Sequence, residues 1–365
     1  MGGDAILVIV VITALAFDFT NGFHDTANVV ATSISTRALS PRIAVGLASI
    51  LNFAGAFISL KVAATIAKGI VDAGSVTTTI VFAGLIGAIA WNVLTWYFGL
   101  PSSSSHALIG GVVGAMFVAQ GAGAVNGDGL LSSVIVPALI APVLAFVSAA
   151  IAILITYRIV GAMRPGPTTR GFRLGQVISG NMLALSHGTN DAQKTMGVIT
   201  LALVASGHIA KTHVAVPTWV VASAATAIAL GTYVGGWRII KTMGMRIIKM
   251  DAAQGFSAQS AGAAVILASS HFGYPLSTTH VISGGIMGAG AAKRLSAVRW
   301  GVAGNIAGAW VLTLPASAAI GGAVWGITRI FGSGAVGPLV VAVLLIALVA
   351  YMFARRPRVV AEATR

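Results

Sequence analysis

Carboxylate and amide side chains recur at helical spacing within an otherwise apolar part of this chain. Asp18, Asn21, Asp25 and Asn28 follow one another at steps of 3, 4 and 3 residues. Residues at these steps share one face of a helix. Carboxylate and amide oxygens gathered on one face form a hard, oxygen-rich site, which suits Na⁺, a proton or a metal ion.

A later segment repeats this arrangement. His187, Asp191 and Lys194 stand at steps of 4 and 3 residues, so they too share a helical face. Lys194 is in position to neutralise Asp191 or to contact an anion directly. The alternative interpretation is that both segments are buried, mutually satisfied polar groups that hold helices together.

Two further segments are rich in small hydroxyl groups. The sequence PSSSSHALIGGVVGA at 101–115 matches PLSTTHVISGGIMGA at 275–289. Each proline fixes a turn, and the hydroxyls can cap the helix that follows. The N–H groups and positive dipole end of such a helix form a seat for an anion, although plain helix capping is the alternative. The candidate anion ligands are Ser103, Ser104, Ser105, Ser277, Thr278 and Thr279.

These segments make the chain two copies of one unit. Asp25 aligns with Asp191 and Gly22 with Gly188 at an offset of 166 residues, and the hydroxyl segments repeat at an offset of 174. A long internal repeat of this kind implies two similar structural halves. We expect a first repeat at 1–157, a cytoplasmic linker at 158–173, a second repeat at 174–328, and an extra C-terminal transmembrane helix with a basic tail at 329–365.

The composition indicates a membrane protein. Hydrophobic residues make up 57% of the chain and charged residues only 8%, which is too few to cover a soluble surface. Apolar runs at 43–66, 132–156, 300–328 and 336–354 are long enough to cross a bilayer. Polar clusters inside such segments indicate a solute path. The absence of cysteine from the sequence excludes disulfides and cysteine-based metal sites.

The distribution of basic residues predicts the orientation. The segments expected in the cytoplasm carry 17 of the 22 lysines and arginines, as the positive-inside rule requires. Each half is expected to contain a broken helix with the polar cluster, a plain helix, a re-entrant hairpin and a last helix. Three full spans per half is an odd number, so the second half must insert upside down. The predicted fold is therefore all-α, a polytopic membrane protein with two inverted repeats.

The paired segments NGFHDTAN and SHGTNDAQK, together with PSSSSH and PLSTTH, resemble the signatures of the inorganic phosphate transporter (PiT) family, and in particular its bacterial low-affinity permeases. The resemblance covers essentially the whole chain. It implies secondary transport of inorganic phosphate, a homodimer, and coupling to H⁺ or Na⁺. Phe23 and His24 before Asp25, and Thr189 before Asn190, depart from the common Gly-Ala-Asn-Asp form. This variant resembles proton-coupled members that carry metal-phosphate.

The resemblance also implies a role for individual residues. The phosphate ligands would be Asp25, Asn28, Asp191 and Lys194 with the six hydroxyl residues above. The coupling-cation ligands would be Asp18, Asn21, Asp25, Asn190 and Asp191. His24 and His187 are candidates for a proton relay, although a membrane histidine can equally be a hydrogen-bond partner.

The resulting hypothesis is a symporter in the bacterial plasma (inner) membrane. Phosphate, free or complexed with a divalent metal, enters with a cation, expected to be H⁺. A carboxylate repels a phosphate unless a cation lies between them, so substrate and cation favour each other's binding. Alternatives are a Na⁺-coupled symporter, a carrier of sulfate, a channel, or a membrane-embedded enzyme, for which the usual motifs are missing. No cofactor, resident metal or nucleic-acid partner is expected; membrane lipid surrounds the protein.

Overall fold

The computed structural model describes residues 2–68, 75–210, 215–332 and 334–355, and within these ranges the regular elements are helices, with no strand. The first half of the chain forms α1 (Gly2–Ser35), α2 (Pro41–Gly55), α3 (Lys61–Lys68), α4 (Thr78–Phe98), α5 (Ser104–Gln120), α6 (Gly127–Leu130) and α7 (Val136–Val160). The second half forms α8 (Pro165–Ala205), α9 (Thr218–Val234), α10 (Trp237–Lys241), α11 (Ala252–Phe272), α12 (Thr278–Lys293), α13 (Trp300–Ile330) and α14 (Val336–Ala354).

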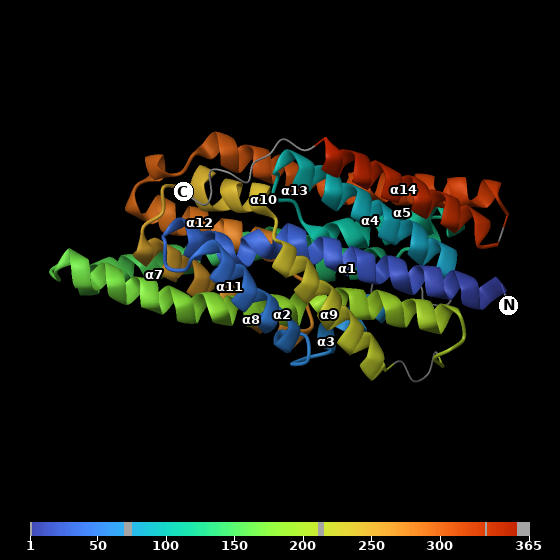
Figure 1. The fold of residues 1–365 in the computed structure, drawn as a ribbon, viewed down its shortest axis with the longest axis horizontal. Helices are drawn as coiled ribbons and strands as arrows, with labels where there is room; N and C mark the ends of the chain where they lie inside the picture. Colours follow the sequence, from blue (N-terminus) through green and yellow to red (C-terminus); the bar gives the residue numbers. More distant parts are fainter. Residues whose placement is uncertain (1, 69–74, 211–214, 333, 356–365) are drawn as a thin grey trace.

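The two long helices α1 and α8 run antiparallel through the middle of the molecule (Figure 1). At one end Asp4 lies 3.8 Å from His208, which follows α8. At the other end the Thr36 hydroxyl donates to Gln176 near the start of α8, at 2.8 Å. An inverted repeat requires this antiparallel course, although the boundaries of the two repeats stay a prediction.

Both polar helices are continuous, so the predicted break within each of them is wrong. The glycine of each motif allows close packing instead of a break. A Cβ on Gly22 would lie 2.3 Å from the Ile228 carbonyl of α9, and one on Gly188 would lie 2.2 Å from the Asn52 carbonyl of α2. Because neighbouring helices reach the polar side chains directly, the backbone need not unwind to satisfy them.

The breaks lie in the next element of each half. The run at 43–66, expected to be one span, is divided into α2 and α3 by a turn at 56–60. In the second half α9 and α10 meet at an angle of 60°. Gly235, at φ +73°, ends α9 in a conformation that glycine adopts most readily.

Each half also contains the predicted helical hairpin. In the first, α4 ends at Gly99 and α5 begins after Ser103; in the second, α11 ends at Gly273 and α12 begins after Ser277. Both glycines are left-handed helix caps. The two tips meet, since the ring centroids of His106 and His280 are 4.8 Å apart.

The last helix of each half packs on the hairpin of the other half. α13 covers α4 and α5, whereas α7 covers α11 and α12. Glycines make both contacts possible: a Cβ on Gly114 would lie 2.0 Å from the Ala318 carbonyl, and one on Gly288 would lie 2.1 Å from the Phe146 carbonyl. We call this arrangement the crossed packing of α7 and α13.

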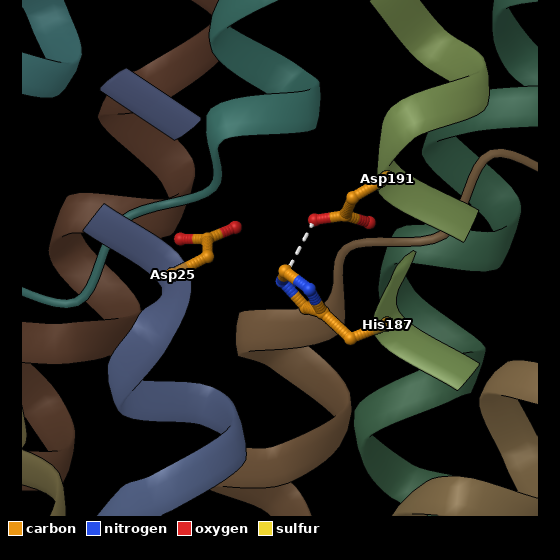
Figure 2. Close-up of side chains that lie close together, drawn as sticks. All are labelled: Asp25, His187 and Asp191. Atoms are coloured by element: carbon orange, nitrogen blue, oxygen red, sulfur yellow. Dashed lines mark ion pairs between the residues drawn. The ribbon is translucent and has the colours of Figure 1, made fainter. Parts of the chain in front are cut away.

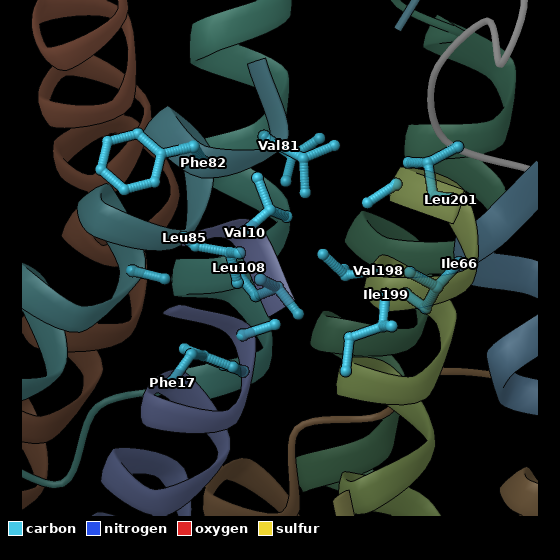
Figure 3. Close-up of a cluster of buried hydrophobic side chains, with 14 of the residues drawn as sticks. Val10, Phe17, Ile66, Val81, Phe82, Leu85, Leu108, Val198, Ile199 and Leu201 are labelled. Atoms are coloured by element: carbon cyan, nitrogen blue, oxygen red, sulfur yellow. The ribbon is translucent and has the colours of Figure 1, made fainter. Parts of the chain in front are cut away.

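Two apolar clusters enclose a polar layer. Figure 3 shows part of one cluster, in which Val10 and Phe17 of α1 lie near Leu85 and Leu108 of the first hairpin. The other cluster surrounds the second hairpin and includes Val30 of α1. The polar residues of α1 and α8 lie between these clusters, so the surrounding packing keeps them away from water.

The remaining predictions concern the linker, the C-terminus and the membrane. Residues 165–173 form the first turns of α8 rather than a loop, because Pro165 at the helix start fits a helical backbone. The predicted helix at 336–354 is α14, and residues 356–365 of the basic tail lie outside the described residues. Within the described ranges, five helices are long and apolar enough to cross a membrane, or six if the bent pair α9–α10 counts as one.

Candidate functional site

Four elements bring their polar residues to one buried place at the meeting of the hairpin tips. Among the residues whose exposure is described, the buried lysines, arginines and acidic residues are Asp18, Asp25, Asp191 and Lys194. α1 supplies the first two and α8 the others. Since burying a charge is expensive unless it is paired, this concentration marks a functional site.

The Asp25 carboxylate connects α1 to both hairpins. It accepts a hydrogen bond from the Ser104 hydroxyl at 2.6 Å and lies 2.7 Å from Nδ1 of His24. The Thr279 hydroxyl of the other tip approaches it at 3.5 Å. On its far side the His24 ring contacts the hydroxyls of Thr95 and Ser102 at 3.2 and 3.3 Å. Asp25 is therefore joined through His24 to the end of α4.

The Asp191 carboxylate pairs with the buried ammonium group of Lys194 at 2.5 Å. The same ammonium donates to the Ser105 hydroxyl of one tip and to the Leu276 carbonyl of the other, at 2.5 and 2.9 Å. The Thr278 hydroxyl donates to Asp191 at 3.3 Å. Lys194 thus links α8 to both hairpins and leaves its charge beside the starts of α5 and α12.

Asn28 completes the contact between α1 and the second hairpin. Its amide donates to the hydroxyls of Thr278 and Thr279 at 3.2 and 2.9 Å. The structure therefore brings together eight of the ten predicted phosphate ligands through direct contacts, namely Asp25, Asn28, Ser104, Ser105, Asp191, Lys194, Thr278 and Thr279.

The remaining two predicted ligands have a structural task. The Ser103 and Ser277 hydroxyl oxygens cap α5 and α12 by accepting from the N–H groups of His106 and His280, at 3.1 and 3.3 Å. These caps orient the first turn of each helix toward the site. Asn190, predicted as a cation ligand, donates through its amide nitrogen to Ser270 of α11 at 2.9 Å, while its amide oxygen is buried without a hydrogen-bond partner.

Three side chains form a group that could hold a cation, although the sequence predicts no resident metal. Ligand atoms of Asp25, His187 and Asp191 all lie within 4.8 Å of one another. Figure 2 shows Asp25 on α1 facing His187 and Asp191 on α8, with Nε2 of His187 3.2 Å from the Asp191 carboxylate. Two carboxylates with an imidazole suit a proton or a hard to borderline metal ion.

A second polar group lies next to this site. Both oxygens of the Asp18 carboxylate are buried without a hydrogen-bond partner, and so are the amide atoms of Asn21 and Asn92. The side chains of Asn21 and Thr195 lie beside the Asp18 carboxylate. Oxygens that lack donors in a dry environment favour a proton or a cation. The role of Asp18 and Asn21 as cation ligands stays a prediction.

Sequence reasoning missed several members of this network. Asn52 of α2 contacts Nδ1 of His187 at 3.2 Å and donates to Thr232 of α9 at 2.8 Å. Thr95 and Asn92 belong to α4. Each is an isolated polar residue in an apolar run, and this isolation was the one sequence feature that could have marked it as part of a buried polar network. The residues that Asn52 and Thr95 contact, His187 and His24, lie far away in the sequence, so periodicity could not identify these two.

The formal charge of the site shapes what it can bind. Taking the histidines as neutral, three aspartates and one lysine leave two negative charges among the buried residues. An anion entering this environment meets repulsion unless cations or protons accompany it. The arrangement can thus bind an oxyanion and a cation together.

Comparison with known proteins gives a consistent result. Residues 21–321 match the model of the phosphate transporter family. The chain is 53% identical over 327 residues to the probable low-affinity inorganic phosphate transporter of Mycobacterium tuberculosis strain H37Rv, covering 90% of this chain and 78% of that protein. It is 46% identical to the protein of the same description from Bacillus subtilis strain 168, covering 86% and 94%.

A solved structure supports the same relationship. The sodium-dependent phosphate transporter superposes on this fold with a TM-score of 0.76 and 26% sequence identity, covering 89% of this chain and 99% of that one. The family and these relatives are transporters rather than enzymes, which confirms the expectation that this protein is not an enzyme. The chain is an integral membrane protein that belongs to the phosphate transporter family.

Proposed function

We propose that this protein imports inorganic phosphate across a bacterial plasma membrane by symport with a cation, which we assign as H⁺. The observation that carries this proposal is the convergence of two capped helix starts and Lys194 beside two buried aspartates. Hydroxyls and N–H groups at helix starts bind a tetrahedral oxyanion, while the aspartates accept the protons of a protonated phosphate.

The phosphate would lie between the starts of α5 and α12. Four tip hydroxyls already contact the charged or amide groups of the site: Ser104 contacts Asp25, Ser105 contacts Lys194, Thr278 contacts Asp191 and Thr279 contacts Asn28. Small rotations of these hydroxyls would direct them at the substrate. Lys194 supplies the one positive charge. We take Ser103 and Ser277 to act through their helix caps.

Coupling follows from the charge of the site. With two negative charges already present, phosphate binding needs added positive charge. Asp25, Asp191 and the unpartnered Asp18 carboxylate are the groups that can take it, with Asn21 beside Asp18. The direct contact between His24 and Asp25 supports H⁺ as the coupling ion, since an imidazole ring can both accept and donate a proton beside a carboxylate.

A second candidate has its own support. The structural relative is described as sodium-dependent, and the buried oxygens around Asp18 would also suit Na⁺. The group of Asp25, His187 and Asp191 would equally hold the divalent ion of a metal-phosphate substrate. We further propose that the protein works as a homodimer surrounded by lipid and alternates its opening through the antiparallel halves.

The decisive experiment is uptake of radiolabelled phosphate into proteoliposomes under an imposed pH gradient or an imposed Na⁺ gradient, each with and without Mg²⁺. We expect the pH gradient to drive accumulation. Accumulation that requires Na⁺ would replace H⁺ by Na⁺ as the coupling ion, and Mg²⁺-dependent uptake would identify metal-phosphate as the substrate. Uptake under neither gradient would refute the symporter.

A further inference from the structure

The tip of the first hairpin is held by two side chains of α10 and the segment that follows it. Arg238 donates through Nη1 to the Tyr97 carbonyl, and the Thr242 hydroxyl donates to the Gly99 carbonyl at 2.8 Å. The guanidinium also lies over the rings of Trp96 and Tyr97, at 5.6 and 5.0 Å from their centroids. The broken helix of the second half, α9–α10, thus binds the end of α4.

The tip of the second hairpin is held in the same manner by α3. The Lys61 ammonium donates to the His271 carbonyl at 2.8 Å, and the Thr65 hydroxyl donates to the Gly273 carbonyl at 2.8 Å. The broken helix of the first half, α2–α3, therefore binds the end of α11. We call each basic residue with its threonine a tip clamp.

The two tip clamps make the same pattern of hydrogen bonds. In each, the basic residue and the threonine are four residues apart, and the carbonyls they bind are two residues apart. Each threonine also donates to the carbonyl of its own basic residue, at 3.2 Å for Thr242 and 3.3 Å for Thr65. Such agreement between Arg238 and Lys61, which share no recognisable sequence motif, indicates a common task.

That task concerns carbonyl groups that helices leave unsatisfied. The last carbonyls of α4 and α11 lack partners within their helices, and cationic side chains bind such groups well. Gly99 and Gly273 are both left-handed, and an added Cβ would lie 3.4 Å from Arg238 and 3.4 Å from Thr65, respectively. The clamps therefore fix the backbone at the point where each tip begins.

The binding hydroxyls follow a few residues later. Ser104, which bonds Asp25, is five residues beyond Gly99, and Thr278, which bonds Asp191, is five residues beyond Gly273. The intervening residues of each tip are not helical. A shift at either glycine would be carried directly to these hydroxyls, and misplacement of about 1 Å is costly at a binding site.

We propose that Arg238 with Thr242, and Lys61 with Thr65, are positioning residues that hold the two hairpin tips in register over the phosphate. Each clamp belongs to the half opposite to the hairpin it holds, so each tip depends on both halves. The predicted effect of the clamps on transport rests on the proposed function of phosphate import. The structural part of the proposal is independent of the substrate.

The transport test uses variants that remove only a hydroxyl. Thr65→Val and Thr242→Val are each expected to raise the apparent KM for phosphate about two- to tenfold, the range for loss of one neutral hydrogen bond. Thr226→Val is the matched control, because this exposed threonine of α9 donates only to Ala222 of its own helix, at 2.7 Å. Lys61→Met should raise KM as Thr65→Val does, and Lys61→Arg should restore it.

The structural test is hydrogen–deuterium exchange of the purified protein. Thr242→Val should speed exchange in peptides covering 95–106 but not 269–280, and Thr65→Val should do the reverse. Unchanged exchange in both tips would overturn the proposal. Faster exchange at a tip with an unchanged KM for phosphate would also overturn the proposal. A variant whose slower uptake is fully explained by a smaller amount of membrane-inserted protein would overturn it as well. Absence of phosphate uptake by the unmodified protein would refute the proposed function, while exchange would still decide whether the clamps hold the tips.

Discussion

At the scale of single residues, Asp25 connects α1 to both hairpins. It contacts its own helix neighbour His24 and hydroxyls from both hairpins. Substitution by asparagine keeps the size and one acceptor oxygen but removes the negative charge. Cation binding would therefore fail while most hydrogen bonds remain.

We expect Asp25→Asn to abolish accumulation of phosphate against its gradient, with an unchanged amount of folded protein in the membrane. Initial-rate uptake and size-exclusion chromatography in detergent would measure both quantities. Asp128→Asn, at an exposed position of α6, is the control and should leave uptake unaffected. Normal accumulation by the Asp25 variant would remove this residue from the coupling mechanism.

Lys194 and Asp191 form a buried ion pair whose members depend on each other. Lys194→Met should destabilise the protein by about 3–5 kcal/mol, because it leaves a buried carboxylate without its partner. The double variant Lys194→Met/Asp191→Asn should recover much of this stability yet remain inactive, since the positive charge of the site is lost. Denaturation in detergent and uptake would be compared for the unmodified protein, Lys194→Met, Asp191→Asn and the double variant. Additive losses of stability would show that the pair is not coupled.

At the scale of elements, the sequence predicted the right segments but misplaced the helix breaks. The motif pairs placed Asp25, Asp191 and both hydroxyl tips correctly because equal spacing on a helix fixes which residues share a face. The break was expected within the helix that carries each polar cluster. Gly22 and Gly188 instead allow a neighbouring helix to approach, a role that depends on tertiary contacts absent from the local sequence.

Gly188→Ala tests this interpretation of the motif glycine. The added methyl group would meet the backbone of α2 at Asn52, and overpacking of this kind costs typically about 1–3 kcal/mol. We expect a lower denaturation temperature in detergent. Gly46→Ala in α2 has nothing within 4 Å of its added Cβ, so it should be neutral or slightly stabilising. Equal stability of the two variants would argue against close packing at Gly188.

At the scale of the whole molecule, the basic residues predicted one end as cytoplasmic. Asp251 contacts both Lys293 and Tyr157, at 3.3 and 3.0 Å, so the start of α11 and the ends of α7 and α12 lie together. α8, with 41 residues, is about 60 Å long and extends beyond a hydrocarbon core of about 30 Å. What the sequence could not predict is the crossed packing, because it depends on contacts between distant segments.

The native sequence contains no cysteine, so single cysteines can report orientation directly. Thr169→Cys, in the first turns of α8, should react with a membrane-impermeant maleimide only from the cytoplasmic side. His208→Cys, just beyond the other end of α8, should react only from outside. Labelling of intact cells would detect the outside cysteine, and labelling of permeabilised cells would detect both cysteines. Reaction of both from the same side would contradict the orientation predicted by the positive-inside rule.

The crossed packing of α7 and α13 also bears on how the protein matures during synthesis. When the second hairpin emerges from the ribosome, α7 has already been synthesised, so α12 can pack against it at once. The first hairpin has no such partner: α13 begins about 180 residues after α5 ends. At ordinary translation speeds this interval is about 10–40 s. Two hairpins with matching tips therefore mature on different schedules, and the first must remain in the bilayer without its α13 contact until that helix has been made.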